Sequence, residues 1–100
     1  MKRLRVFLAE GNPAFRECMA DYITNDLGCV LVGAASTCEE LLQQDSVYCA
    51  NIVLIDTRLP GGGGYSVARS ILQENHRKCL IAMTTATEPL SLMDVMLTGF

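Results

Sequence analysis

The 100-residue chain has no tryptophan, one histidine and three prolines, and only 19% of its residues are charged. Half of the residues are hydrophobic, so the chain can bury enough apolar surface to offset its ordering entropy, which excludes disorder. No apolar run approaches roughly 20 residues, and this excludes a membrane span. The net charge of -3 argues against a nucleic-acid surface, because phosphate contacts need basic side chains. These absences leave one small globular domain.

The five cysteines lack the number and the spacing that zinc sites and disulfide frameworks need. Their number is odd, and no two of them form a CxxC pair. We therefore expect buried, reduced thiols in a cytoplasmic protein. The basic residues at positions 1–5 are soon followed by acidic ones, so no secretory signal is predicted.

Short apolar runs alternate with segments of helical spacing along the whole chain. The runs predict strands at residues 6–9, 29–32, 52–55 and 79–83. Helices are expected from residue 12 to Gly28, from 37 through 42, after the glycine run 61–64 as far as 72, and from about 87 to 98. Continuous apolar strands are typical of a parallel sheet covered on both faces. The order predicts a doubly wound α/β domain with right-handed crossovers.

Acidic and hydroxyl side chains follow the predicted strands at the edge where such sheets bind ligands. Glu10 follows the first strand, Asp56 the third and Thr84 the fourth. If the first and third strands are neighbours, the two carboxylates meet, and they repel unless a proton or a cation lies between them. Oxygen ligands of this kind suit Mg²⁺, and a carboxylate beside Mg²⁺ can accept a phosphoryl group. The Thr84 hydroxyl could hydrogen-bond a phosphoryl oxygen.

The glycine run at residues 61–64 is not expected to be a phosphate cradle. No Lys-Ser or Lys-Thr pair follows it, as a P-loop requires. We expect a flexible loop in which Gly64 adopts a positive φ.

The segment 53–65 resembles the third strand and following loop of response-regulator receiver domains. In that family the strand ends in a phosphoacceptor Asp, with proline four residues later and glycine eight later, as Pro60 and Gly64 follow Asp56 here. The family's first strand and helix resemble residues 6–16, and its fourth strand resembles residues 80–84. The resemblance implies a flavodoxin/CheY-like sheet with strand order 2-1-3-4, in a regulatory domain that is not an enzyme.

The same resemblance implies a role for each residue of the acidic edge. Asp56 is expected to be the phosphoacceptor and Thr84 the switch hydroxyl. Glu10 is expected to be an acid of the metal pocket, and Arg58 to lend its backbone carbonyl to Mg²⁺. Gly11 stands where the family has a second acid, which predicts weak Mg²⁺ binding because a charge and a ligand are lost.

The function implied is that of a two-component signalling receiver. It would take a phosphoryl group from a histidine kinase and regulate an effector, often a DNA-binding domain, outside this chain. Gly11, and Thr85 where the family favours a small residue, motivate an alternative, a phosphorylation-independent module that forms a homodimer or docks another protein. A flavodoxin-like or hydrolase enzyme is disfavoured, because no hydroxyl-rich phosphate loop follows the first strand.

The family pattern continues beyond residue 100 with a fifth strand and a fifth helix, which carry a lysine and an aromatic residue used in switching. We therefore expect residues 1–100 to be one receiver-like domain from a longer response regulator. Without the fifth strand, residues 79–83 would form a sheet edge, which invites pairing with another chain. A chain complete at this length would be marginally stable, self-associating or completed by a partner.

Overall fold

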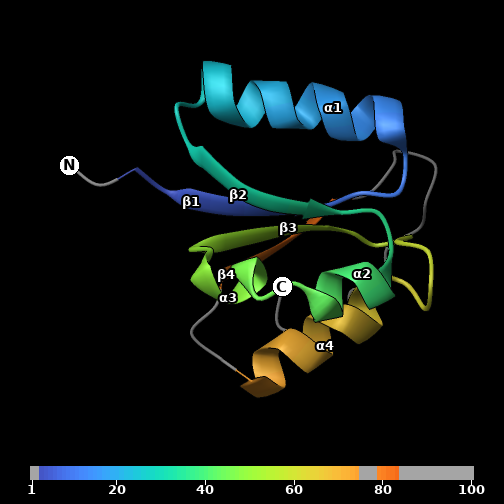
Figure 1. Cartoon of the computed structure of the whole chain (residues 1–100). Coiled ribbons are helices and arrows are strands. Elements are labelled where there is room, and N and C mark those ends of the chain that lie inside the picture. Colours follow the sequence, from blue (N-terminus) through green and yellow to red (C-terminus); the bar gives the residue numbers. More distant parts are fainter. Residues whose placement is uncertain (1–2, 75–78, 84–100) are drawn as a thin grey trace.

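A computed structural model describes residues 3–74 and 79–83, and it places a sheet between two layers of helices (Figure 1). The elements are, in chain order, β1 (Arg5–Ala9), α1 (Pro13–Asp21), the π-helical turn η1 (Tyr22–Asp26), β2 (Val30–Ala35), α2 (Cys38–Gln43), α3 (Ser46–Cys49), β3 (Ile52–Asp56), α4 (Gly64–Glu74) and β4 (Cys79–Met83). The described strands form one sheet in the order β2-β1-β3-β4. The predicted fold class and strand order are confirmed.

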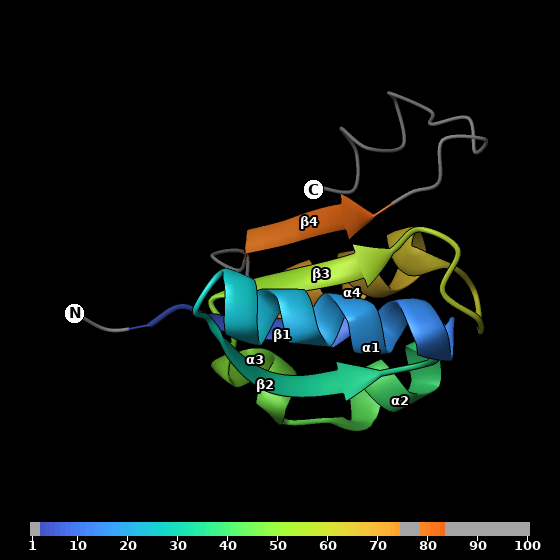
Figure 2. The ribbon, with the colours of Figure 1, turned by 90° about the horizontal axis from the view of Figure 1, so that it is seen from above.

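Every strand pair in the described sheet is parallel, so the carboxyl ends of the strands lie at one edge (Figure 2). β1 pairs with β2 on one side and with β3 on the other. Ala9 lies opposite Ile55 at the last paired position of β1 and β3. The residues that follow these positions, Glu10 and Asp56, are therefore neighbours.

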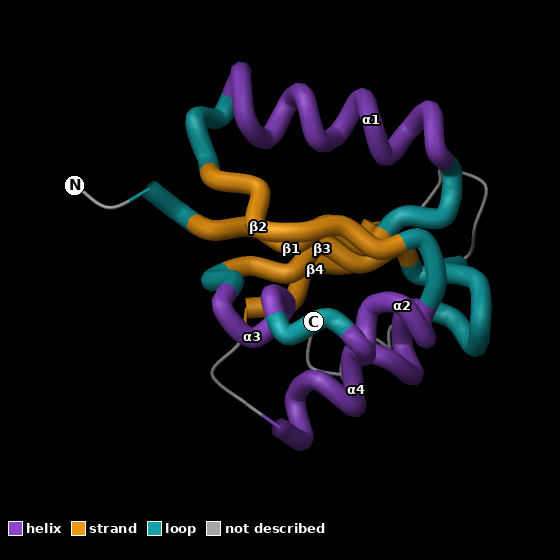
Figure 3. Tube along the Cα trace, in the orientation of Figure 1, coloured by secondary structure: helices purple, strands orange, loops and turns teal. Residues whose placement is uncertain are grey.

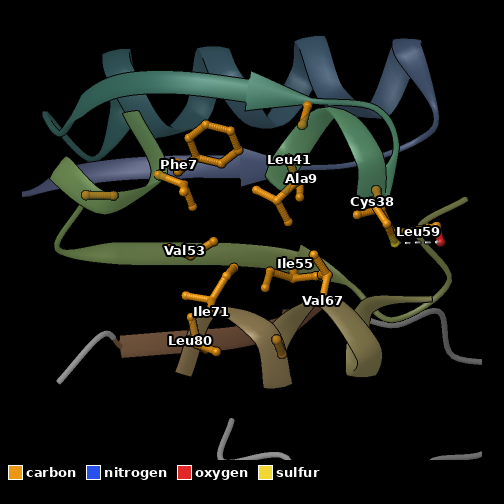
Figure 4. Packing of buried hydrophobic residues seen from close by; sticks show 14 residues of the cluster. Phe7, Ala9, Cys38, Leu41, Val53, Ile55, Leu59, Val67, Ile71 and Leu80 are labelled. Carbon is orange, nitrogen blue, oxygen red and sulfur yellow. Dashed lines mark hydrogen bonds between the residues drawn. The ribbon is translucent and has the colours of Figure 1, made fainter. Parts of the chain in front are cut away.

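The helices cover the sheet unequally. α1 and η1 lie over one face, while α2, α3 and α4 lie over the other (Figures 1 and 3). On the α2–α4 face, Phe7, Val53 and Ile55 belong to a cluster of 14 buried residues (Figure 4). On the α1 face, the buried cluster among the described residues is Val6, Leu8 and Ile23. Because apolar burial is the main stabilising contribution, the α2–α4 face holds the principal core.

The structure has two features that the sequence pattern did not predict, a longer β2 and an additional short helix. The apolar run ends at residue 32, but β2 continues through Gly33 to Ala35. A Cβ at Gly33 would stand 2.6 Å from the Ser46 hydroxyl and 2.7 Å from the Phe7 ring, so glycine lets these groups approach the strand. The helix α3 was not predicted, because a helix of four residues has too few positions to show a period.

The cysteines are reduced but mostly not buried, which corrects part of the prediction. All five are free thiols. Cys18, Cys49 and Cys79 are exposed and Cys29 is partly covered, whereas Cys38 is buried. The prediction of a buried, reduced thiol therefore holds for Cys38 and is wrong for the exposed cysteines.

The predicted helix at residues 87–98 lies outside the described residues. Thr84 and Thr85 lie outside them too. Within the described ranges, 3–74 and 79–83, we find no helix with the length and hydropathy that a membrane span requires.

Candidate functional site

Glu10 and Asp56 come together at the carboxyl edge of the sheet, as neighbouring first and third strands predict. Glu10 follows β1, and Asp56 is the last residue of β3. Only 8% of the Glu10 surface is exposed, and its side chain is hydrogen-bonded to that of Asp56. Two carboxyl groups can share a hydrogen bond only when one of them is protonated, and when both are ionised they repel unless a cation lies between them.

The surroundings of Glu10 favour its protonated form. Burial raises the pKa of Glu10, and the charge of Asp56 and the hydrogen bond to it raise the pKa further. The backbone N–H of Asn12 and the charge of Arg16 oppose this shift only in part. Arg16 Nη1 also donates to the backbone oxygen of Glu10 at 2.9 Å, which ties α1 to the end of β1. The pair therefore keeps a proton to a higher pH than an isolated glutamate does.

A tight turn orients the Asp56 carboxylate. The backbone N–H of Arg58 donates to Asp56 Oδ1 at 3.0 Å, which is the geometry of an Asx turn. The N–H of Leu59 donates to the backbone oxygen of Asp56 at 3.1 Å. The N–H of Thr57 donates to the backbone oxygen of Met83 at 3.0 Å, so the turn is also attached to the end of β4.

The glycine run after Asp56 uses glycine for two different reasons. Residues 61–63 have φ values of +98°, +124° and +85°, a backbone conformation that side chains with a Cβ disfavour. Gly64 is not among the positive-φ glycines, so the prediction that it adopts one is wrong. A Cβ at Gly64 would instead stand 2.3 Å from the backbone oxygen of Asp56, so only glycine lets α4 begin against the end of β3.

A cavity of about 570 Å³ opens beside the paired carboxylates. It is lined by Glu10, Gly11, Asn12, Phe15, Asp56, Arg58, Pro60 and Met83. These residues come from the ends of β3 and β4, from the loops after β1 and β3, and from the first turn of α1. The structure thus gathers Glu10, Asp56 and Arg58 around one space. Thr84 is outside the described residues, so its predicted place at this cavity is not described.

The donor set at this cavity suits a hard cation that keeps most of its water. Carboxylate oxygens are the side-chain ligands that Mg²⁺ prefers, and one or two of them suffice when phosphate oxygens complete the shell. Among the described residues, no group of three or more His, Cys, Asp or Glu side chains converges. Gly11 itself is closely covered, because a Cβ there would stand 2.8 Å from Cδ of Pro60. The residues present therefore fit Mg²⁺ with few protein ligands.

Comparison with known sequences points to one family. The response regulator receiver domain family matches residues 6–99. The DNA-binding transcriptional activator DevR/DosR of Mycobacterium tuberculosis is 27% identical to this chain over 97 residues. The match covers 96% of this chain but 44% of that protein, so the chain spans less than half the length of this curated relative.

Solved structures share the fold across almost the whole chain. A two-component response regulator of the LuxR family from Aurantimonas sp. has a TM-score of 0.85 at 23% identity, covering 98% of this chain and 70% of that one. The signal receiver domain of NarL from Mycobacterium tuberculosis also has a TM-score of 0.85, at 21% identity, covering 99% and 80%. Such identities establish the fold alone. The family match over residues 6–99 shows that this chain belongs to the response regulator receiver domains, the regulatory phosphoacceptor domains of two-component systems.

Proposed function

We propose that this chain accepts a phosphoryl group from a histidine kinase on Asp56, and that the modification regulates a DNA-binding effector in a longer parent chain. The observation that carries the proposal is the pairing of Asp56 with the buried Glu10 at one cavity of the carboxyl edge. The effector is supported by the relative DevR/DosR, which is named as a DNA-binding activator and of which this chain matches 44%.

The chemical step needs little beyond an oriented carboxylate. An oxygen of Asp56 attacks the phosphorus of the phosphohistidine donor, and a P–O bond forms as the P–N bond breaks. The electron pair of the broken bond stays on the imidazole nitrogen, which takes up a proton, and Asp56 becomes an aspartyl phosphate. The hydrogen bond from the Arg58 N–H to Asp56 Oδ1 holds the carboxylate, so less orientational freedom is lost in the transition state.

The remaining residues of the cavity have supporting roles in this proposal. Glu10, Asp56 and the backbone carbonyl of Arg58 would hold Mg²⁺. When it is bound, the ion neutralises the charge that develops on the phosphoryl oxygens. Thr84 would act as the switch hydroxyl, and its contact with the phosphoryl group would favour one of two conformations of the domain.

Intact-mass measurement after incubation with Mg²⁺ and acetyl phosphate tests the proposal. We expect the wild-type chain to gain the mass of one phosphoryl group, and Asp56→Asn to gain none. Asp26→Asn, which changes an exposed aspartate, serves as the matched control and should react like wild type. A wild-type chain that stays unmodified while a competent receiver reacts in the same buffer would overturn the function. Modification that persists in Asp56→Asn would overturn the site.

A second candidate function is a phosphorylation-independent module that acts by forming a homodimer or by docking a protein. The observation that favours it is the absence of a third acid among the described residues at this edge, where Gly11 stands. Sedimentation velocity separates the two candidates. A dimer that forms equally in wild type and Asp56→Asn, with no response to acetyl phosphate, supports the second candidate and contradicts the first.

A further inference from the structure

Cys38, the first residue of α2, contacts the loop that follows the proposed phosphoacceptor. Its backbone N–H donates to the backbone oxygen of Pro60 at 2.8 Å. Its thiol lies 3.6 Å from the backbone oxygen of Leu59 (Figure 4), and 3.4 Å from that of Gly63, both within hydrogen-bond range for sulfur. One residue of α2 therefore faces three carbonyl groups of a loop more than 20 residues away.

This loop needs anchors outside itself. Three consecutive residues, 61–63, have positive φ values, and glycine loses more backbone entropy on ordering than any other residue. Within the loop, the N–H of Gly63 donates to the backbone oxygen of Leu59 at 3.0 Å. The Leu59 side chain is buried, with 1% of its surface exposed, and it packs in the same core cluster as Cys38. The contacts of Cys38 and the burial of Leu59 thus both attach the loop to the core beneath α2.

The contact reaches the proposed site through Pro60. Pro60 lines the cavity, and its Cδ lies 2.8 Å from the position that a Cβ at Gly11 would take. The backbone of the same residue accepts the N–H of Cys38. A movement of the loop away from Cys38 would consequently shift Pro60, which lines the same cavity as Glu10 and Asp56.

The chemistry of the Cys38 side chain suits a donor rather than a nucleophile. Burial raises the pKa of the Cys38 thiol, so it stays protonated at neutral pH and can donate its S–H. Only 6% of the residue is exposed. The first-turn position also matters, because the N–H of the first residue of a helix has no partner within the helix and is free to bind Pro60.

We propose that Cys38 is a positioning residue of the phosphoacceptor site, which acts through the loop 57–63 and Pro60 without touching the reacting atoms. Its effect on phosphorylation rests on the proposed function of Asp56. Its effect on the conformation of the loop is independent of that function. The role of Cys38 and the function of Asp56 can therefore be tested separately.

The test compares Cys38→Ala, which removes the thiol, with Cys38→Ser, which keeps a hydrogen-bond donor. Val47→Ala is the matched control for lost packing, because Val47 is fully buried in the same cluster but its backbone hydrogen bonds join it to Gln44 and Ala50 rather than to the loop. Cys18→Ala controls for loss of a thiol, since Cys18 is exposed. Each variant is measured for thermal stability, for amide hydrogen exchange of residues 57–63, and for the rate of phosphorylation by acetyl phosphate.

We expect Cys38→Ala to speed exchange in residues 57–63 and to slow phosphorylation by about tenfold, the lower end of the effect that supporting hydrogen bonds have at metal sites. Cys38→Ser should restore most of both. Val47→Ala should lower thermal stability at least as much while leaving the loop exchange and the phosphorylation rate near those of wild type. Cys18→Ala should match wild type in all three measurements.

Each contrary result overturns a defined part of this inference. Loop exchange that stays at the wild-type rate in Cys38→Ala shows that the residue is only part of the core. Faster loop exchange with an unchanged phosphorylation rate removes the positioning role. Faster exchange in a protein whose wild type is never phosphorylated leaves the anchor in place and overturns the proposed function of Asp56, and with it the role in phosphorylation.

Discussion

The core cluster and the carboxyl edge meet within β3, where the buried Ile55 is followed directly by Asp56. In the core, apolar side chains such as Phe7 and Val53 have no exposed surface. One residue further along the strands, Glu10 and Asp56 bring two carboxyl groups into contact, and burial together with the charge of Asp56 raises the pKa of Glu10. Among the described residues, no buried polar side-chain atom lacks a hydrogen-bond partner, so the conflict at the edge is one of charge.

This difference shows where the domain gains stability and where it gives some up. Apolar burial in the core stabilises the fold in proportion to the area removed from water. At the edge, like charges and close backbone approaches lower stability, as is common where a site is arranged for binding or catalysis. Losing apolar burial in the core should therefore cost the most stability, whereas removing one of the like charges at the edge should raise it.

The largest difference is expected when a phenylalanine is replaced by alanine once in the core and once at the edge. Phe7→Ala removes a fully buried ring from the core and should lower the free energy of unfolding by about 3–5 kcal/mol. Phe15→Ala removes a ring that is 47% exposed at the rim of the cavity and should change it by no more than about 0.5 kcal/mol. Urea unfolding measures both. Equal losses would contradict the division between core and edge.

The next effect is expected at the point where α4 begins against β3. Gly64→Ala places a Cβ 2.3 Å from the backbone oxygen of Asp56, so α4 or the strand end must move. We expect a loss of about 2–3 kcal/mol and slower phosphorylation, because the displaced backbone carries Asp56, the proposed phosphoacceptor. Ser66→Ala, at an exposed position of the same helix, is the control and should leave both unchanged. Unchanged stability in Gly64→Ala would show that the contact is easily relieved.

Two substitutions of Gly11 distinguish the effect of steric crowding at the edge from the effect of charge. Gly11→Ala should lower the free energy of unfolding by about 1–2 kcal/mol, because its Cβ would meet the Pro60 ring. Gly11→Asp should lose a similar amount without Mg²⁺ but bind Mg²⁺ about tenfold more tightly, since affinity rises with ligand charge. Calorimetric titration with Mg²⁺ reports the second effect. Equal Mg²⁺ affinities in the two variants would show that position 11 is not a ligand position.

The smallest predicted effect is an increase in the free energy of unfolding, whereas the substitutions above lower it. The pKa of Glu10 is raised from its ordinary value of 4.5, so the folded protein binds this proton more tightly than the unfolded chain does. The free energy of unfolding therefore falls as the pH rises from 4.5 through the raised pKa, and it stays lower above it. Glu10→Gln removes this fall and should be more stable than wild type at pH 7 without Mg²⁺, by about 0.5–1 kcal/mol.

Urea unfolding between pH 4 and pH 8 checks this prediction. The exposed Glu17 offers the matched control, because Glu17→Gln should keep the wild-type pH profile. A Glu10→Gln variant that is less stable than wild type at pH 7 would show that the ionised pair does not destabilise the fold. The same variant should bind Mg²⁺ more weakly, since one carboxylate ligand is lost.

Much of the fold could be predicted because it depends on local patterns. Continuous apolar runs separated by helical segments indicated a parallel sheet, and the observed β3 and β4 begin where their runs begin. The end of β2 could not be predicted, because Gly33 continues the strand only where the Phe7 ring packs against it. The helix break at Gly28 was indicated by glycine itself, which has a φ of +67° there.

The candidate site was predictable in its acids but not in its surroundings. Glu10 and Asp56 stand directly after apolar strands, and parallel order brings such residues together. The positive φ predicted for Gly64 is wrong. The glycine is needed for a close approach to Asp56, and such an approach leaves no trace in the sequence beyond the glycine itself. Cys38 was expected only as a buried thiol, and nothing around it in the chain indicates contacts with residues 59–63.

Sequence alone determined which residues lie on buried strands and which acids follow them, because hydrophobic period and chain order are local properties. The resemblance to receiver domains also indicated that Gly11 stands where that family has a second acid. Only the tertiary structure decided that Pro60 covers Gly11, that Glu10 is buried against Asp56, and that Cys38 contacts the loop that follows Asp56. These outcomes depend on contacts between segments far apart in the chain, whose distances are set by packing rather than by any one segment.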